Sequence, residues 1–218
     1  EIYRTEYDLL LDSLERTDLK VAIAGHKATG KTALRHCLQA SYEPPSLTFT
    51  DHSDADLVLL LVAGDMTASE LNQLETLVSE GYQVLVVLNK QDQYTPMDKA
   101  VVLDRIKGRV AERGVEVVAI AANPNPIKVR RHLESGEIAE FFEQPTAEIT
   151  PLTQKLDSLI AEPAPLVMAT TLRQTKVLQQ RIIQEINLYR RQKAIPVIEQ
   201  MQWIAAGTAF ANPIITVD

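Results

Sequence analysis

Two hydrophobic patterns alternate along the first two thirds of the chain. Mainly apolar runs of strand length occupy residues 20–24, 57–62, 84–88 and 115–120, interrupted only by Lys20 and Glu116. Between them, apolar residues recur every three or four positions, as they do on one face of a helix. Because such runs are typical of strands buried on both faces, the alternation predicts βα units and a mostly parallel sheet flanked by helices.

The helical segments carry recognisable start and stop signals. Residues 67–81 begin with a Thr-x-x-Glu capping box and end at a glycine, and residues 95–114 begin with Thr-Pro and also end at a glycine. A leading helix over residues 2–17 places its apolar side chains on one face, which predicts packing on the domain that follows. These side chains are Tyr3, Tyr7, Leu10, Leu11 and Leu14.

The pattern changes after residue 140. Prolines between residues 141 and 165 indicate a linker, with one short helix near residues 152–161. Residues 166–200 then predict a long helix, interrupted at most near Pro196, and residues 203–211 are small and apolar. Two interpretations stay open for this end: it is buried on the preceding domain or on a dimer partner, or it begins a membrane-contacting element of a longer native protein.

A phosphate-binding motif follows the first apolar run directly. Residues 25–32 read Gly-His-Lys-Ala-Thr-Gly-Lys-Thr, a G-x-x-x-x-G-K-[ST] loop in which backbone N–H groups and the positive end of a helix face a phosphate chain. Gly25 and Gly30 permit the tight backbone. Lys31 is placed to reach the β- and γ-phosphates, and the Thr32 hydroxyl to complete the shell of a bound Mg²⁺. A chance match in a strand-to-helix turn is the alternative.

A second motif indicates which nucleotide is bound. The run 84–88 is followed by Asn89-Lys90-Gln91-Asp92, at the carboxyl end of a strand, where open α/β sheets bind ligands. The Asp92 carboxylate can accept hydrogen bonds from the ring N–H and the exocyclic amine of guanine, a pair that adenine lacks. The stem of Lys90 can lie along the base, and Asn89 can tie this loop to the phosphate loop or the base.

Together and in this order, the two motifs resemble those of the Era-like branch of translation-factor-type GTPases. Within that branch, the chain looks most similar to bacterial and cyanobacterial GTPases in which a G domain precedes a hydrophobic C-terminal domain of uncharacterised function. The similarity covers most of the chain. It rests on residues 21–34, 56–65, 89–92 and 121–131, and on the tail around residues 205–213.

The resemblance implies a fold, a ligand and a division of the chain. It implies an α/β P-loop NTPase G domain over residues 19–145, an N-terminal helix over 1–18, and a linker with C-terminal helices over 146–218. It further implies GTP or GDP as the ligand, Lys31 as the catalytic residue, and Mg²⁺ held by Thr32 and by Asp51. The residues assigned to the nucleotide are Gly25, His26, Lys27, Ala28, Thr29, Gly30, Lys31, Thr32, Ala33, Asn89, Lys90, Asp92, Ala121 and Ala122.

One stretch is too short for this resemblance. Between the phosphate-loop helix and the next strand, such a GTPase needs switch I, two antiparallel strands, a D-x-x-G motif and switch II, or about 35 residues. Only 15 residues separate Ala40 from Asp56. Either the domain is reduced, or the sequence joins segments that mobile switch loops separate in the native chain. We expect the second, because ordering of these loops signals the nucleotide state, and residues 47–51 are then the strand that ends in Asp51.

Other family features are missing or altered. No D-x-x-G glycine, switch I threonine, or catalytic glutamine or histidine can be assigned. Ala28 stands where potassium-stimulated Era-like enzymes carry Asn, so activation by a monovalent cation through that side chain is not expected. Ala121-Ala122 stands where the family has a Ser-Ala pair, and a backbone N–H there can still reach the base carbonyl.

Composition narrows the function classes. With 218 residues and 45% apolar content, the chain can form one core and a helical appendage. A net charge of −7 argues against general nucleic-acid binding, and the basic cluster at residues 128–132 is either a local patch or a solvated strand edge. The single cysteine, Cys37, excludes an intrachain disulfide. No apolar run reaches about 18 residues, so we expect a cytoplasmic protein, peripheral or membrane-associated in its full-length form.

Three functional hypotheses result. The first is a guanine-nucleotide switch with slow GTPase activity, whose C-terminal helices report its state to a protein effector, a second copy or a membrane surface, and which has no nucleic-acid partner. The second is a pseudo-GTPase that acts as a scaffold through its long helix. The third is a P-loop ATPase or small-molecule kinase, against which Asp92 argues.

Overall fold

The computed structural model describes residues 2–42, 44–132 and 138–211. The chain comprises two compact units, which we treat separately. The larger unit extends from Leu10 to Arg173, and the smaller one combines residues 1–9 with the chain from Gln174 onward.

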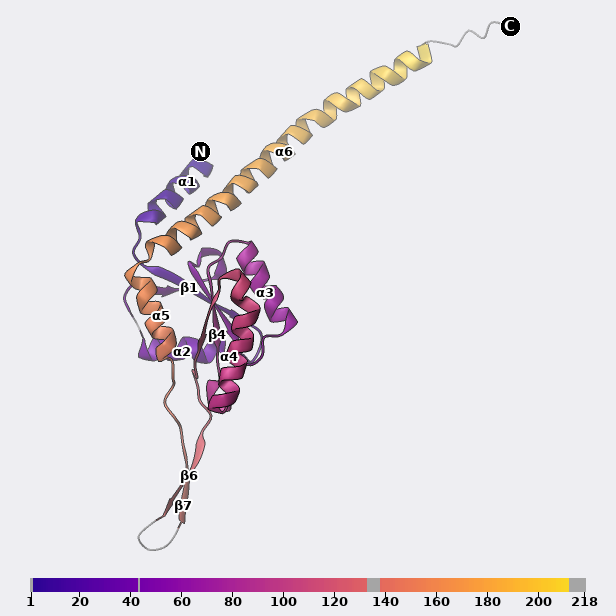
Figure 1. Ribbon diagram of the computed structural model, residues 1–218. Helices are drawn as coiled ribbons and strands as arrows, with labels where there is room; N and C mark the ends of the chain where they lie inside the picture. Colours follow the sequence, from indigo (N-terminus) through magenta and orange to yellow (C-terminus); the bar gives the residue numbers. More distant parts are fainter. Residues whose placement is uncertain (1, 43, 133–137, 212–218) are drawn as a thin grey trace, which may run out of the picture. The chain divides into compact units, whose positions relative to one another are not determined.

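A five-stranded parallel sheet forms the centre of the larger unit (Figure 1). The strands follow the order β2-β1-β3-β4-β5, and every neighbouring pair is parallel. Their bounds are β1 Leu19–Gly25, β2 Leu47–Phe49, β3 Leu57–Val62, β4 Val84–Leu88 and β5 Glu116–Ala119. All six residues of β3 are buried, as the unbroken apolar runs predicted. The predicted α/β class is therefore confirmed.

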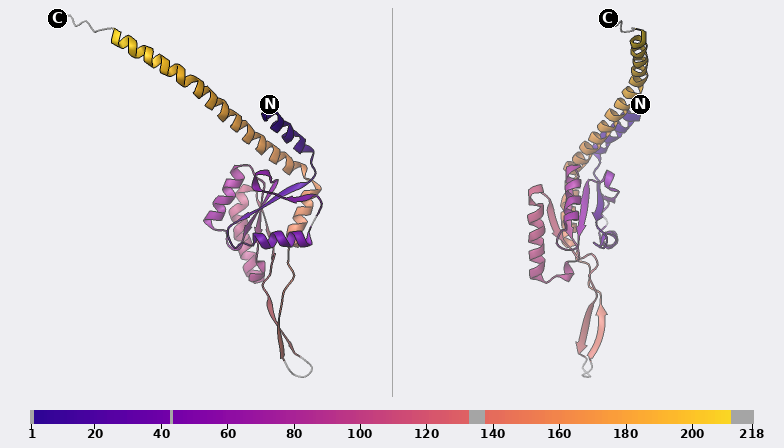
Figure 2. Two further views of the ribbon diagram at one scale, coloured as in Figure 1. Left: turned by 180° about the vertical axis from the view of Figure 1, so that it is seen from behind. Right: turned by 90° about the vertical axis from the view of Figure 1, so that its right-hand side faces the viewer.

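Helices cover both faces of this sheet (Figures 1 and 2). The helices α3 (Ala68–Ser79) and α4 (Pro96–Val110) pack on one face, and α2 (Lys31–Ser41) and α5 (Thr150–Ala161) pack on the other. Alternate residues of β3 point to the two faces, so that Leu60 joins the α3 and α4 side and Leu59 the α2 and α5 side. Single turns of 3₁₀ helix lie at Ser13–Glu15, His52–Asp54, Gln91–Gln93 and Ala111–Arg113.

The predicted helix ends are confirmed. At the start of α3, the Thr67 hydroxyl accepts a bond from the Glu70 N–H at 3.3 Å, and the Glu70 carboxylate accepts one from the Thr67 N–H at 2.8 Å. The glycines beyond α3 and α4, Gly81 and Gly114, have φ angles of +85° and +64°. Glycine adopts this left-handed conformation without strain, so Gly81 ends the chain's helical path after α3 and Gly114 ends the 3₁₀ turn that follows α4.

The segment expected to begin a linker contains ordered structure instead. The strands β6 (Ile127–His132) and β7 (Ile138–Glu143) form an antiparallel hairpin, so the linker prediction is wrong for residues 141–143. Proline positions marked the exit from this hairpin, but its cross-strand pairing leaves no short-range signal. The short helix predicted near residues 152–161 is present as α5.

Helix α5 belongs to the core of the larger unit. Leu152 and Leu156 are fully buried in the cluster that also contains Leu34 of α2. At the far end of α2, the Tyr42 hydroxyl donates to the Asp157 carboxylate at 2.6 Å. Burial raises the pKa of Tyr42, and this hydrogen bond raises it further, so the phenol stays protonated. The domain limits at residues 145 and 146 remain a prediction.

The longest helix, α6, spans Ala164–Ala211 and continues through Pro196 without a break. The predicted helix over 166–200 is therefore present and longer than expected. In the smaller unit, Arg181 of α6 forms an ion pair of 3.0 Å with Glu6 of the leading helix α1 (Ile2–Asp12). Among the described helices, none has an apolar stretch of the length and low charge needed to cross a bilayer.

A buried ion pair closes the amino-terminal edge of the sheet. The Arg16 guanidinium donates to both carboxylate oxygens of Asp56, at 2.7 and 2.5 Å, and Asp56 is 1% exposed. The Lys20 N–H donates to the same carboxylate at 2.8 Å. Since an unpaired charge at this depth is costly, each partner depends on the other.

The substitution Asp56→Ala is expected to lower the free energy of unfolding by about 3–5 kcal/mol, because it leaves the Arg16 charge without a partner in a largely buried place. Urea denaturation monitored by circular dichroism measures this loss. Asp65→Ala is the matched control, since the Asp65–Arg105 pair is exposed and contributes about 0–1 kcal/mol. Equal losses in the two variants would contradict a structural role for the Asp56 pair.

Candidate functional site

The phosphate loop connects β1 to α2 at the carboxyl edge of the sheet, as the sequence predicted. Gly25 and Gly30 have φ angles of +132° and +96°. A Cβ atom at Gly25 would lie 2.4 Å from the Leu61 carbonyl oxygen, and one at Gly30 would lie 2.3 Å from the Asn89 side chain. Both positions therefore need glycine, for backbone conformation and for space.

Lys31 is folded back onto the loop. Its ammonium group donates to the carbonyl oxygens of Gly25 and His26, at 2.7 and 2.6 Å. These bonds hold the charge over the concave side of the loop, where a phosphate would replace the carbonyls as the acceptor. The Thr29 hydroxyl donates to the same His26 carbonyl at 3.0 Å, which braces the turn from within.

A single buried amide side chain joins three loops. Asn89 is 2% exposed, its Nδ2 donates to the Thr29 carbonyl at 2.9 Å, and its Oδ1 accepts from the Ala122 N–H at 3.0 Å. Asn89 thus ties the loop after β4 to the phosphate loop and to the segment after β5. The sequence predicted the first of these links and missed the second.

The carboxylate proposed to read guanine lies in a cavity of its own. Asp92 is exposed and lines a hollow of about 240 Å³ together with Ala121, Asn125 and Ile127. One Asp92 oxygen accepts from the Asn125 N–H at 3.0 Å. Lys90, which begins the turn, has a φ angle of +64°. No sequence signal marks the Asn125 amide as a partner of Asp92.

The Ala121-Ala122 segment departs from its predicted use. The Ala121 N–H donates to the Glu148 carbonyl at 2.9 Å, and the Ala122 N–H donates to Asn89. Both amides of the segment expected to offer an N–H to the base carbonyl are therefore engaged within the protein. Ala121 still lines the Asp92 cavity, so the segment shapes the hollow.

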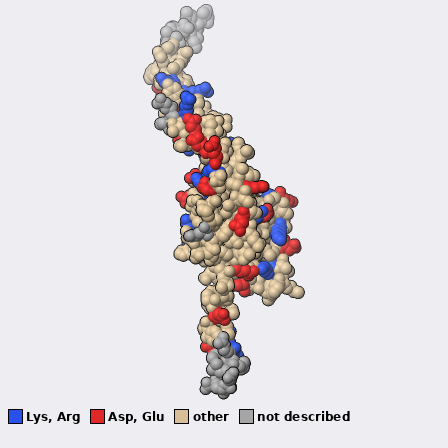
Figure 3. Space-filling model, turned by 90° about the vertical axis from the view of Figure 1, so that its left-hand side faces the viewer, with Lys and Arg blue, Asp and Glu red and all other residues tan. Residues whose placement is uncertain are grey.

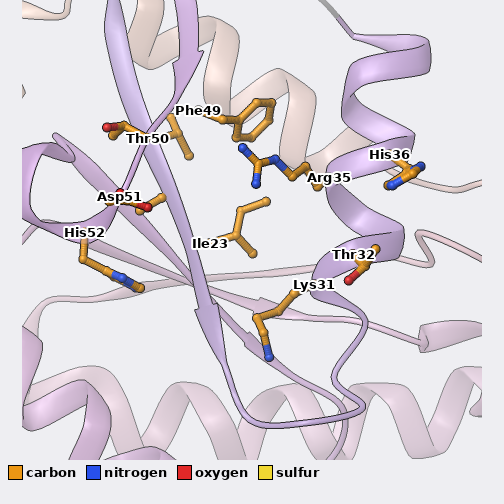
Figure 4. Close-up of a pocket in the computed structure, with 11 residues that line it drawn as sticks. Ile23, Lys31, Thr32, Arg35, His36, Phe49, Thr50, Asp51 and His52 are labelled. Atoms are coloured by element: carbon orange, nitrogen blue, oxygen red, sulfur yellow. The ribbon is translucent and has the colours of Figure 1, made fainter.

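A cavity of about 420 Å³ lies between α2 and the end of β2 (Figure 4). Lys31 and Thr32 enter it from α2, and Asp51 enters from the turn after β2. The two residues predicted to hold Mg²⁺, Thr32 and Asp51, thus line one space. The described residues contain no group of three His, Cys, Asp or Glu side chains that could hold a metal without other ligands. A cation here would need phosphate oxygens or water to complete its shell.

A further hollow of about 580 Å³ lies beside the start of α2. Its lining includes Thr32, Ala33, Cys37 and Asn123. Burial raises the pKa of the Cys37 thiol, so it stays protonated at neutral pH and is a poor nucleophile. Cys37 contributes shape to this hollow.

The predicted strand that ends in Asp51 is present but short. Strand β2 ends at Phe49, two residues before Asp51, and runs parallel to β1. Within residues 44–56 it is the one strand that the structure describes, where the resemblance requires two antiparallel strands. Asp51, Thr50 and His52 follow it into the cavity of Figure 4.

The basic cluster at residues 128–132 is partly neutralised. Lys128 and Arg130 both pair with Glu140 across the hairpin, at 2.5 and 2.7 Å. Figure 3 shows basic and acidic residues interspersed on the face of the larger unit that it presents. The cluster therefore fits a solvated strand better than a nucleic-acid surface.

Comparisons with known proteins give distant matches of fold only. Neither protein-family models nor curated proteins match the chain. Among solved structures, apo translation elongation factor SelB from Methanococcus maripaludis is 17% identical with a TM-score of 0.43, over 48% of this chain and 29% of SelB. Era Y63A from Aquifex aeolicus, bound to GDP·AlF₄⁻, is 18% identical with a TM-score of 0.39, over 47% of this chain and 50% of Era.

The cytosolic domain of the FeoB iron transporter from T. maritima, in its GMPPNP form, gives a similar result. It is 18% identical with a TM-score of 0.34, over 48% of this chain and 56% of that domain. The chain thus spans less than two thirds of each of these proteins. The similarity concerns about half of the chain and assigns no activity.

The substitution Asn89→Ala is expected to lower the free energy of unfolding by about 2–4 kcal/mol, because it leaves the buried Thr29 carbonyl and Ala122 N–H without partners. Chemical denaturation measures the loss, and hydrogen exchange at Ala122 should accelerate with it. Asn123→Ala, at an exposed neighbour, is the control and should change stability by less than about 0.5 kcal/mol. An Asn89 variant as stable as the control would contradict the bridging role.

Proposed function

We propose that the chain is a guanine-nucleotide-binding protein that hydrolyses GTP slowly and acts as a molecular switch. The observation that carries this proposal is the Asn89 bridge. By holding the phosphate loop, the Asp92 turn and the segment after β5 together, it aligns a phosphate site and a guanine-reading carboxylate along one edge of the sheet. One nucleotide that spans this edge would engage both.

Each part of the ligand then has a partner. The loop amides, Lys31 and the positive end of α2 bind the phosphates. The Thr32 hydroxyl, and Asp51 through water, would hold Mg²⁺, which would offset the negative charge of the phosphates. Asp92 accepts from the guanine N–H groups after exchanging or sharing its bond to Asn125. A carboxylate accepts several hydrogen bonds, so this exchange needs no large movement.

Hydrolysis proceeds by in-line attack of water on the γ-phosphate. Lys31 spreads the developing charge, to which a bound Mg²⁺ would add, and positioning supplies most of the remaining acceleration. Since no residue in the sequence is assigned to orient the water, we expect turnover on the order of 10⁻³ s⁻¹ or below. The alternative is a pseudo-GTPase scaffold, which would bind nucleotide without such turnover or would not bind it.

The turn after Asp51 connects the cavity of Figure 4 with the first turns of α6. Asp51 and His52 line the cavity, while the carbonyls of Ser53 and Ala55 accept bonds from Arg173, both at 3.1 Å. The Arg173 guanidinium also lies 3.8 Å from the centre of the Tyr82 ring. A nucleotide that reorders Asp51 would therefore act on contacts made by the first turns of α6.

The partner of the switch is proposed to bind the distal part of α6. Exposed apolar side chains there include Val197, Met201, Trp203 and Ile204, and Trp203 is 80% exposed. Such a surface suits a protein effector, a second copy of the chain or a membrane surface.

Asp92→Asn tests the guanine assignment. The variant should lose at least about a hundredfold in affinity for GDP and gain affinity for xanthosine diphosphate, because an amide NH₂ can donate to the additional xanthine carbonyl. Fluorescent-nucleotide titration measures both affinities. Asp104→Asn, at an exposed position of α4, is the control and should retain the guanine preference. If Asp92→Asn bound GDP as tightly as the wild type, Asp92 would not read the base.

Arg173→Ala tests the connection to α6. Hydrogen exchange at residues 52–56 should quicken in this variant, because the Ser53 and Ala55 carbonyls each lose the Arg173 donor and Ala55 keeps the Thr170 hydroxyl. The dependence of this exchange on bound nucleotide should diminish. Lys176→Ala, an exposed neighbour, is the control. If residues 52–56 of the wild type exchanged equally with GDP and with a GTP analogue, the scaffold alternative would be favoured over the switch.

A further inference from the structure

The cavity of Figure 4 is lined by one cationic side chain, that of Arg35, to which the motifs assign no role. Arg35 lies four residues after Lys31 on α2, so the two side chains share one face of the helix and line the same space. His36 lies four residues after Thr32 on α2 and also lines the cavity. Helix α2 thus presents two successive turns of polar side chains to this cavity.

The direction of the Arg35 side chain is fixed by the helix and by an aromatic ring. Side chains on a helix lean toward its amino end, which here is the phosphate loop. The Arg35 guanidinium lies 5.6 Å from the centre of the Phe49 ring, and Figure 4 shows it extending from α2 toward β2. Among the described residues, Arg35 has no carboxylate partner within ion-pair distance.

The charges that line the cavity favour an anion. Lys31 and Arg35 supply two positive charges, and Asp51 is the one carboxylate among the lining residues. Arginine presents a planar fork of N–H donors that matches phosphate oxygens, and a weakly hydrated guanidinium leaves water readily. A second phosphate contact beyond Lys31 is therefore chemically suited to this position.

The position of Asp51 indicates which phosphate Arg35 would meet. A Mg²⁺ held by Thr32 and Asp51 would lie against the outer phosphates. Arg35 lines the same cavity as Asp51, with its guanidinium at Phe49, two residues before Asp51. We propose that Arg35 contacts the terminal phosphate of bound GTP from within the same chain, and so distinguishes the triphosphate from the diphosphate. This inference rests on the proposed nucleotide binding.

The same contact would assist hydrolysis. The water oxygen forms a bond to the γ-phosphorus, the bond to the bridging oxygen breaks with its electron pair on GDP, and the water protons pass to phosphate and solvent. Arg35 offsets the negative charge on the γ-phosphoryl oxygens and the bridging oxygen. Among the residues that the structure describes, no other arginine lines the cavity.

Arg35→Gln, titrated by calorimetry with Mg²⁺ and either GDP or the β,γ-imido analogue of GTP, tests the inference. Affinity for the analogue should fall about tenfold to a hundredfold, while that for GDP stays within about twofold. Arg35→Lys should fall between wild type and Arg35→Gln, because lysine keeps the charge and loses the fork. Single-turnover GTP hydrolysis by Arg35→Gln should slow at least about tenfold.

Two controls separate this role from a structural one. Lys107→Gln removes the same charge from an exposed position of α4 and should change neither affinity. Because Arg35 is exposed, the melting temperature of Arg35→Gln should stay within about 2 °C of the wild type. Equal loss of GDP and analogue binding, or no loss of either, would overturn the role of Arg35 and leave the proposed function intact. A wild type that binds neither ligand would overturn both.

Discussion

The buried amide of Asn89 is the contact on which the rest of the site depends. Its two hydrogen bonds fix the phosphate loop against the segment after β5, with the Asp92 turn between them. The close approach also explains the glycine at position 30, where a Cβ atom would displace the Asn89 side chain. A buried amide with both ends satisfied is rigid, so the phosphate loop and the Asp92 turn keep their separation.

The parts of this architecture that are local in sequence could be predicted from it. Mainly apolar runs identified the strands, and the capping box at Thr67 identified a helix start, because both follow from short-range chemistry. The phosphate loop and the Asp92 turn could also be identified, from the spacing of their motif residues. The link from Asn89 to the phosphate loop followed from the order of the two motifs on a parallel sheet.

Contacts between distant segments could not be predicted. The β6–β7 hairpin depends on cross-strand pairing, and the engagement of the Ala121 amide depends on Glu148, which lies 27 residues farther along. The Arg16–Asp56 pair joins residues 40 positions apart, and Arg173 reaches back to the turn after β2. Arg35 could not be identified from the sequence for another reason. It lies outside the phosphate-binding motif, and nothing in its spacing distinguishes it from any other exposed residue of a helix. Its role is suggested only by the cavity that it lines.

The most direct test of the central claim, that one edge of this sheet binds a guanine nucleotide, is calorimetric titration of the nucleotide-stripped wild-type protein with GDP, GTP and ADP in the presence of Mg²⁺. The account predicts binding of GDP and GTP with a Kd in the micromolar range or tighter, about −8 kcal/mol or better, and no binding of ADP. Binding of ADP as tight as that of GDP would contradict the role of Asp92. Absence of all binding would contradict the nucleotide site and leave the fold as a scaffold.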